Sequence, residues 1–361
     1  DMARFMIAHL QGGRYENTSI LGETTVEEMH RRHFTHHPKL AGICYAFLER
    51  YYNDQRILWH DGGTYGFTSL LILAPEQNLG FFVAYNIEDS TIARERLVEN
   101  FFDHYFPVSK PPAPAPMPNA SRERASTFAG TYRVSRHGHR GLEKLEALIG
   151  KVPETVVTAN SDDGITLDGR HLVEVEPLLF QFDSGRGHVA FRQDSQGRVT
   201  HLFAGRSTAW AFERLAWYEQ RQFHLALCGG TAFVFLVTLL IVPIVRRFRK
   251  PVTTPAPAVR RAWRCAYAVS GLNLLFLVCL AATLILWREE VQYQMPKPLV
   301  ALLYMPVANL ILTAALLLTT ITLWLKRQAL LATRLYHSLL SVSAVAFIWF
   351  LLHWNLLKFH Y

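Results

Sequence analysis

The stretch WHDGGTYGF, residues 59–67, gathers groups that could take part in chemistry. It places an imidazole (His60) beside a carboxylate (Asp61) and two glycines (Gly62 and Gly63). Histidine exchanges a proton near neutral pH, and glycine lets a substrate approach the backbone closely because it has no Cβ. On residue types alone, a strand histidine followed by turn glycines is the simpler interpretation, so the neighbouring elements must decide.

Residues 1–106 are predicted to be mixed α and β. The segments ICYAFLERYY and RILWHDG read as two strands, and a hairpin follows, with strands at 69–73 and 80–86 around the turn PEQN. The segment IARERLVENFFDHYF predicts a closing amphipathic helix. Thr25 and Glu28 have the spacing of a capping box, which predicts a short helix through about His33.

The whole block RILWHDGGTYGFTSLLILAPEQNLGFFVAYN resembles the third-motif region of the serine β-lactamase-related hydrolases, which include class C β-lactamases, DD-peptidases, esterases and D-aminopeptidases. In that family a strand near the active site carries Lys-Thr-Gly or His-x-Gly, and here His60-Asp61-Gly62 stands in that position. The upstream segments DMARFMIAHLQGG and TTVEEMH also resemble family segments. The resemblance covers about residues 1–105 and implies the C-terminal part of an α+β, β-lactamase-like domain.

The resemblance implies catalytic roles for His60 and Gly63 and substrate-binding roles for Asp61 and Gly62. Acyl transfer needs a nucleophile, a base and donors aimed at the developing oxyanion. The resemblance assigns the backbone N–H of Gly63 to the oxyanion, and it places His60 near the leaving group or carboxylate of the substrate. Asp61 replaces the usual hydroxyl residue, and an acid there would repel an anionic substrate. We expect no cofactor.

Two family motifs are missing from these 361 residues. No serine is followed by lysine three residues later, so Ser-x-x-Lys is absent. The match Tyr51-Tyr52-Asn53 to Tyr-x-Asn lies at a hairpin turn close to His60, and we interpret it as chance. We therefore expect the nucleophile, its activating lysine and the tyrosine to lie upstream of Asp1 in the intact protein. Whether the protein is an enzyme is uncertain, and this chain alone is expected to be inactive.

Histidines and cysteines do not predict a metal centre. The stretch HRRHFTHH holds His30, His33, His36 and His37, but two arginines intervene and Pro38 ends any helix, which favours a solvated face. One of the four cysteines lies in the soluble part, with no metal or disulfide spacing. We predict no metal.

A proline-rich linker over residues 107–123 separates the first domain from an all-β accessory domain over 124–217. Short apolar runs between turns such as DGR, DSGRG and SQGR predict a small antiparallel barrel or sandwich. With FAGTYRV at its start and FERLAWYE at its end, this domain resembles the lipocalin-like accessory domain found behind such hydrolases.

Four apolar runs in residues 222–361 are each long enough to cross a bilayer, which takes roughly 20 residues. We expect transmembrane helices at about 225–245, 265–287, 299–325 and 335–357, and hence a lipid bilayer as partner. The loops after the first and third runs carry Arg and Lys without an acid, which by the positive-inside rule puts the soluble domains in the periplasm or extracellular space and the C-terminus outside. The net charge of +8 comes largely from one such loop and does not indicate nucleic-acid binding.

The leading hypothesis is a multidomain, membrane-anchored serine hydrolase that acts on D-amino-acid peptides, esters or β-lactams, so its partner is a small-molecule or peptide substrate. An alternative is a non-catalytic membrane sensor or binding protein for cell-wall fragments or β-lactams. A third is a transporter with an outer accessory domain. The membrane runs hold few ionisable residues, which favours an anchor over a transporter.

Overall fold

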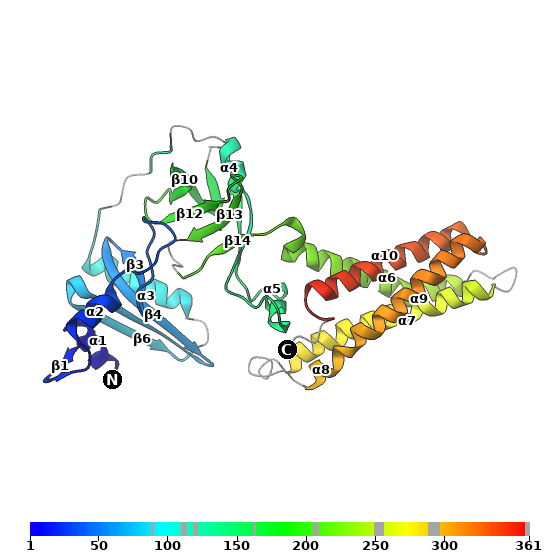
Figure 1. The fold of residues 1–361 in the computed structure, drawn as a ribbon, viewed down its shortest axis with the longest axis horizontal. Helices are drawn as coiled ribbons and strands as arrows, with labels where there is room; N and C mark the ends of the chain where they lie inside the picture. The colour runs from blue at the N-terminus through cyan, green and yellow to red at the C-terminus, as the bar shows by residue number, and fades with distance from the viewer. Residues whose placement is uncertain are drawn as a thin grey trace. The chain divides into compact units, whose positions relative to one another are not determined.

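A computed structural model describes residues 1–87, 90–109, 114–117, 122–161, 164–204, 209–248, 256–287 and 297–357. The chain forms two compact units (Figure 1). Unit 1 comprises residues 1–136 and 153–215, and unit 2 comprises residues 137–152 and 216–361. Three chain crossings therefore join the units, and each unit is described separately below.

Unit 1 begins with a four-stranded antiparallel sheet in the order β3-β4-β5-β6. Helix α3 covers one face, where Ile57, Ile72 and Phe102 form a buried cluster. The other face packs on helix α1 through Met6, Leu58 and neighbouring side chains. The elements in order are α1 (Met2–Leu10), β1 (Arg14–Tyr15), β2 (Thr18–Ser19), α2 (Glu23–His30), β3 (Leu48–Tyr52), β4 (Gln55–Thr64), β5 (Phe67–Ala74), η1 (Pro75–Gln77), β6 (Leu79–Tyr85) and α3 (Thr91–Tyr105).

The second part of unit 1 is a closed eight-stranded antiparallel barrel in which each strand pairs with the next and β14 closes on β7. Phe128, Tyr132, Phe180 and Phe191 meet edge to face and are almost fully buried, so the barrel encloses an aromatic core. Its elements are α4 (Arg122–Phe128), β7 (Gly130–Val134), β8 (Glu154–Ala159), β9 (Ile165–Leu167), β10 (Arg170–Glu176), β11 (Leu179–Phe182), β12 (His188–Gln193), β13 (Val199–Ala204) and β14 (Phe212–Arg214).

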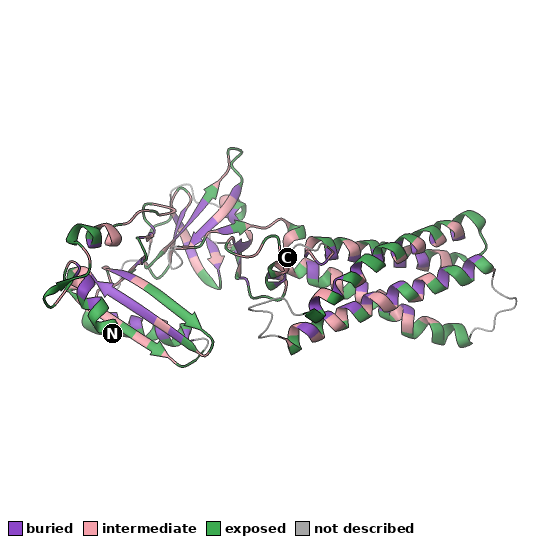
Figure 2. Cartoon of the chain, turned by 60° about the horizontal axis from the view of Figure 1, so that its bottom comes forward, coloured by how far each residue is buried: buried purple, intermediate pink, exposed green. Residues whose placement is uncertain are grey.

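Unit 2 is built on a bundle of long helices. Each helix buries one side and exposes apolar side chains on the other (Figure 2). Four helical segments are long and apolar enough to cross a membrane. Residues 137–152, which connect β7 to β8, belong to this unit. Its elements are η2 (Leu142–Lys144), α5 (Leu145–Leu148), η3 (Trp217–Glu219), α6 (Arg221–Phe248), α7 (Pro257–Leu286), α8 (Lys297–Leu302), α9 (Tyr304–Lys326) and α10 (Leu331–His353).

The structure confirms the predicted small antiparallel barrel and four helices that are long and apolar enough to cross a membrane. Five details differ. Helix α2 begins at Glu23 and has no side-chain cap, so the capping box is wrong. The accessory region contains helix α4, and its residues 137–152 pack with unit 2. The third expected helix is divided at Leu303, and the fourth ends at His353. Much of the proline-rich linker (110–113 and 118–121) lies outside the described residues.

Candidate functional site

Strand β4 carries the stretch identified from the sequence and extends beyond its neighbour. The pairing of β3 with β4 ends at Leu48 and Trp59. Residues 60–64 pair only with β5 on their other side, from His60 with Leu71 to Thr64 with Phe67. All five of these residues are exposed. Within the part of the chain that the structure describes, the end of β4 is therefore an open sheet edge.

The backbone of Gly63 points out from this open edge. In an antiparallel strand, the N–H and C=O of one residue point to one side, and those of the next residue point to the other. Tyr52 and Gln55 flank the two-residue turn between β3 and β4, so the backbone of Gln55 points toward β3. Counting by twos along the strand gives Asp61 and Gly63 the same direction. Beyond the end of β3, their N–H groups face the open side.

A groove of about 770 Å³ lies beside this edge. His60 and Asp61 line it, together with the segment 43–48, other residues of the sheet and of α3, and Arg136, Ala209 and Trp210. Its charged lining consists of three arginines (Arg50, Arg94, Arg136) and two acids (Asp61, Glu95), which leaves one net positive charge. The volume lies within the range of small-molecule sites, roughly 300–1,000 Å³.

Asp61 is not an isolated acid, because Arg94 of helix α3 reaches it. Arg94 Nη2 lies 3.5 Å from Asp61 Oδ2, and Arg94 Nη1 donates to the carbonyl oxygen of Ser69 at 2.7 Å. The Arg94 side chain is 11% exposed, whereas that of Asp61 is 49% exposed. The repulsion of an anionic substrate that the sequence suggested is therefore offset by a cation held in the same groove.

A second cation in the groove is held by aromatic rings. The Arg50 guanidinium carbon lies 4.6 Å from the centre of the Trp59 ring, and Arg50 Nη1 donates to Glu95 at 2.8 Å and to the Tyr52 hydroxyl at 2.7 Å. Burial raises the pKa of Tyr52 to about 12, with Arg50 acting against the rise. Tyr52 is therefore protonated at neutral pH and cannot act as a base there. The indole N–H of Trp59 is buried and has no partner among the described residues.

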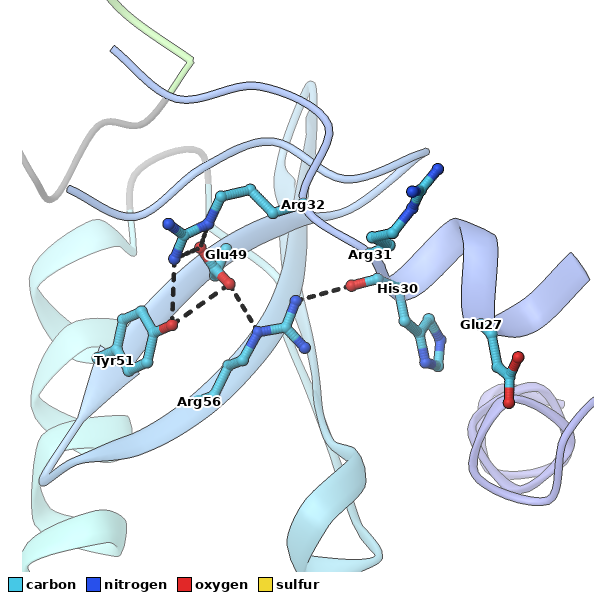
Figure 3. Close-up of a pocket in the computed structure, with 7 residues that line it drawn as sticks. All are labelled: Glu27, His30, Arg31, Arg32, Glu49, Tyr51 and Arg56. Atoms are coloured by element: carbon cyan, nitrogen blue, oxygen red, sulfur yellow. Dashed lines mark hydrogen bonds and ion pairs between the residues drawn. The ribbon is translucent and has the colours of Figure 1, made fainter. Parts of the chain in front are cut away.

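A buried carboxylate holds the segment that borders the groove. Glu49 is 1% exposed, and it accepts hydrogen bonds at 2.6 Å from Nε of Arg32 and from Nε of Arg56 (Figure 3). It also accepts a hydrogen bond from the backbone N–H of Gly42 at 3.0 Å, and the N–H of Glu49 donates to the Gly42 carbonyl at 2.8 Å. Burial alone would raise the pKa of Glu49, but the hydrogen bonds from Arg56 and Arg32 overcome it and lower the pKa. These bonds fix one end of segment 43–48.

The histidines of HRRHFTHH do not share a helix face, because α2 ends at His30. His30 is half-buried and its Nε2 lies 3.2 Å from Nδ1 of His9. Burial, followed by the charges of His9 and Arg56, lowers the pKa of His30 to about 4. His36 is half-buried and stacks on Phe203 of the barrel. The expectation of a solvated face is thus wrong for these two residues. Among the described residues, no group of three potential ligands could hold a metal ion.

The structure brings His60 and Asp61 into the lining of the groove, while Gly62 and Gly63 continue along the edge outside that lining. A Cβ added to Gly63 would meet only Thr68 Cγ2, at 3.9 Å. Sequence reasoning missed Arg94, Arg50 and Glu95. Glu95 lies more than 40 residues from Arg50, its ion-pair partner, so the sequence does not show that they meet. The amphipathic pattern of α3 also does not distinguish charges that line a groove from charges that face solvent.

No family model and no curated protein matches the chain. Among solved structures, SurE matches in a complex with D-Leu (20% identity, 54% of this chain and 44% of that chain, TM-score 0.32) and in a second structure titled SurE (19%, 58% and 47%, 0.34). An octameric penicillin-binding protein homologue from Pyrococcus abyssi matches at 15% identity, over 58% and 45%, with a TM-score of 0.24. The chain thus spans less than half of each of these three structures, and similarities this weak establish no shared activity.

Proposed function

We propose that residues 1–106 form the substrate-binding wall of a serine hydrolase related to the β-lactamases, and that the helices of unit 2 anchor it to a membrane. The observation that carries the proposal is the open, glycine-containing end of β4. There, a backbone N–H faces outward beside an exposed imidazole and next to a groove of small-molecule size. A pre-positioned backbone donor is what a developing oxyanion requires.

The neighbouring groups fit this chemistry. His60 would assist proton transfer at the leaving group, because it is exposed at the groove and an imidazole can both donate and accept a proton. Arg94 and Arg50 line the groove, and their guanidinium groups could bind a substrate carboxylate or carbonyl. The substrate class is a small molecule or peptide with an acyl bond, such as a D-amino-acid peptide, an ester or a β-lactam.

The proposal requires a serine nucleophile and an activating lysine from outside these 361 residues, because no serine here has lysine three positions later. In the reaction, the serine oxygen would attack the acyl carbon. The N–H of Gly63 would stabilise the oxyanion, and the leaving group would depart with a proton. Water would then hydrolyse the acyl-enzyme and regenerate the serine.

The proposed location of the soluble parts is outside the membrane, in the periplasm or extracellular space. Arginines and lysines lie at the end of α6, the start of α7, the end of α9 and the first turn of α10, and these helix ends meet at one end of the bundle. If the positive-inside rule holds, that end is cytoplasmic. The C-terminal end of α10 would then lie on the outer side.

The test compares two substitutions of Gly63 in the natural full-length protein. Gly63→Pro removes the backbone N–H, whereas Gly63→Ala keeps it and adds a methyl group with room to fit. We expect kcat for ester or D-amino-acid amide hydrolysis to fall about 100- to 1,000-fold in the proline variant and by less than about fivefold in the alanine variant. Equal activity of the two variants would exclude the oxyanion role of Gly63.

A second candidate function, a membrane sensor or binding protein without turnover, is favoured by the packing of residues 137–152 in unit 2. Lys144 Nζ donates to the His353 carbonyl at 2.5 Å, and Arg221 Nε donates to the Leu148 carbonyl at 2.8 Å. The connection between β7 and β8 is thereby hydrogen-bonded to α10 and α6. A conformational change on ligand binding could pass through these contacts to the membrane helices. Saturable binding of a β-lactam or wall peptide without measurable hydrolysis would favour this function.

A further inference from the structure

One end of the bundle in unit 2 concentrates positive charge. Helix α6 ends with Arg246 and Arg247, and the first turns of α7 carry Arg260, Arg261 and Arg264. All five side chains are exposed. Residues 221–287 contain no Asp or Glu, so none of this charge is neutralised by an acid from either helix. An excess of arginine without acids attracts phosphate groups.

Contacts between α6 and α7 bring three of these arginines to one face of α7. The Arg246 guanidinium carbon lies 4.7 Å from the centre of the Trp263 ring, and Arg246 Nη1 donates to the Tyr267 hydroxyl at 3.4 Å. Arg260, Arg264 and Tyr267 follow each other at four- and three-residue spacing, which puts them on one face of α7. The contact with Tyr267 therefore brings Arg246 to the face that Arg260 and Arg264 occupy.

When α7 crosses a bilayer, its length allows this group of side chains to lie at the depth of the lipid headgroups. Helix α7 has 30 residues, which gives it a length of about 45 Å, against a hydrocarbon core of about 30 Å. Because Arg260 and Arg264 in its first two turns are exposed charges, the excess length is assigned to this end of the helix, outside the core. Trp263, which is buried under Arg246, and Tyr267 are side chains typical of this interfacial layer.

An apolar surface continues from the arginines toward the middle of the bundle. In the two turns before Arg246, helix α6 exposes four apolar side chains, those of Leu240, Ile241, Ile244 and Val245. Only 17% of the residues in the most apolar stretch of this helix are buried. A ligand that joins a phosphate to acyl chains would contact both the arginines and this surface. A free phosphate ion would contact the arginines alone.

We propose that Arg246, Arg260 and Arg264, together with the Tyr267 hydroxyl, bind the phosphate of an anionic phospholipid whose acyl chains lie along α6. The guanidinium groups supply several donors each for the phosphate oxygens, and the ring of Trp263 holds Arg246 in place. This site lies in unit 2 and does not depend on the proposed hydrolase activity.

The experiment measures lipid binding to the full chain purified in a neutral detergent. The probes are dioctanoyl phosphatidylglycerol, dioctanoyl phosphatidylcholine and inorganic phosphate, followed by native mass spectrometry and by the shift in Tm. We expect the phosphatidylglycerol to bind at least about tenfold more tightly than the phosphatidylcholine, because each arginine near an anionic headgroup contributes about a fivefold factor. Inorganic phosphate at the same concentration should neither bind measurably nor compete.

The double variant Arg260→Gln/Arg264→Gln should weaken phosphatidylglycerol binding by about 30-fold, and Arg260→Lys/Arg264→Lys should restore most of it. The matched control is Arg14→Gln/Arg96→Gln, which removes the same charge from exposed positions in unit 1 and should leave binding unchanged. Equal binding of the two lipids, or equal loss in the control, would overturn the proposal. Competition by inorganic phosphate would show a free-anion site and overturn the assignment to a lipid.

Discussion

Replacing Glu49 by glutamine should destabilise the part of the sheet that borders the groove. The carboxylate is 1% exposed and is bonded to two guanidinium groups and to the N–H of Gly42. Without its charge, Arg32 and Arg56 would face each other around a neutral amide. Loss of one partner from a buried ion pair costs about 3–5 kcal/mol. Arg32 and Arg56 are 30% and 24% exposed, so solvent screens part of their repulsion and the low end, about 3 kcal/mol, is expected.

The assay is hydrogen exchange measured by mass spectrometry on the full chain in detergent. A loss of about 3 kcal/mol corresponds to about 100-fold less protection of the amides in residues 42–64. The matched control is Glu28→Gln, which breaks an ion pair with Arg31 whose side chains are 46% and 65% exposed, and which should change protection less than about fivefold. Similar protection in the Glu49 and Glu28 variants would refute the assigned role of the buried carboxylate.

The same cluster predicts a pH dependence. The pKa of Glu49 is lower in the folded protein than its usual value of 4.5. The unfolded chain therefore binds a proton at a higher pH than the folded chain does, so the stabilisation is complete above about pH 4.5 and is lost as the pH falls through the folded pKa. Exchange protection of residues 42–64 should fall over this range in the wild type. It should change much less in the Glu49→Gln variant, which has no carboxylate to titrate.

Three further predictions concern unit 1. Gly42→Ala should reduce protection of segment 42–48 at least about tenfold, because the added Cβ would lie 2.4 Å from the carbonyl oxygen of Phe34; unchanged protection would contradict this. His30 has a pKa lowered to about 4, so its neutral form is favoured by folding and stability should fall between pH 6.5 and 4; His30→Gln should flatten that part of the thermal stability profile. Phe180→Ala should destabilise the barrel by about 3–5 kcal/mol in denaturant unfolding, whereas Val156→Ala at a half-exposed position should cost under about 1 kcal/mol.

The architecture was largely predictable because its signals are local. Alternating apolar runs separated by glycine-containing turns predict barrel strands, and apolar runs of membrane length predict the helices. Helix boundaries were less predictable. Thr25 has the type and spacing of a cap residue, yet helix α2 starts two residues earlier, at Glu23. The division at Leu303 leaves no mark in the apolar pattern.

The candidate site was predictable only in part. Sequence placed His60 and Asp61 on a strand beside a hairpin, and the structure puts both at the groove. The sequence did not show that β3 stops pairing with β4 at Leu48. The point where one strand stops pairing depends on the register of the two strands. The sequence also could not pair Arg94 with Asp61, since that contact joins positions 33 residues apart.

The central claim is that the open edge of β4 binds the oxyanion. A structure of the natural protein with a phenylboronic acid bound would test this claim most directly. Boronic acids form a tetrahedral adduct with an activated serine and so imitate the intermediate of acyl transfer. The account predicts a boronate oxygen about 2.7–3.1 Å from the backbone nitrogen of Gly63, with His60 lining the same groove. An adduct elsewhere, or one whose oxygens lie beyond hydrogen-bond distance of Gly63, would contradict it.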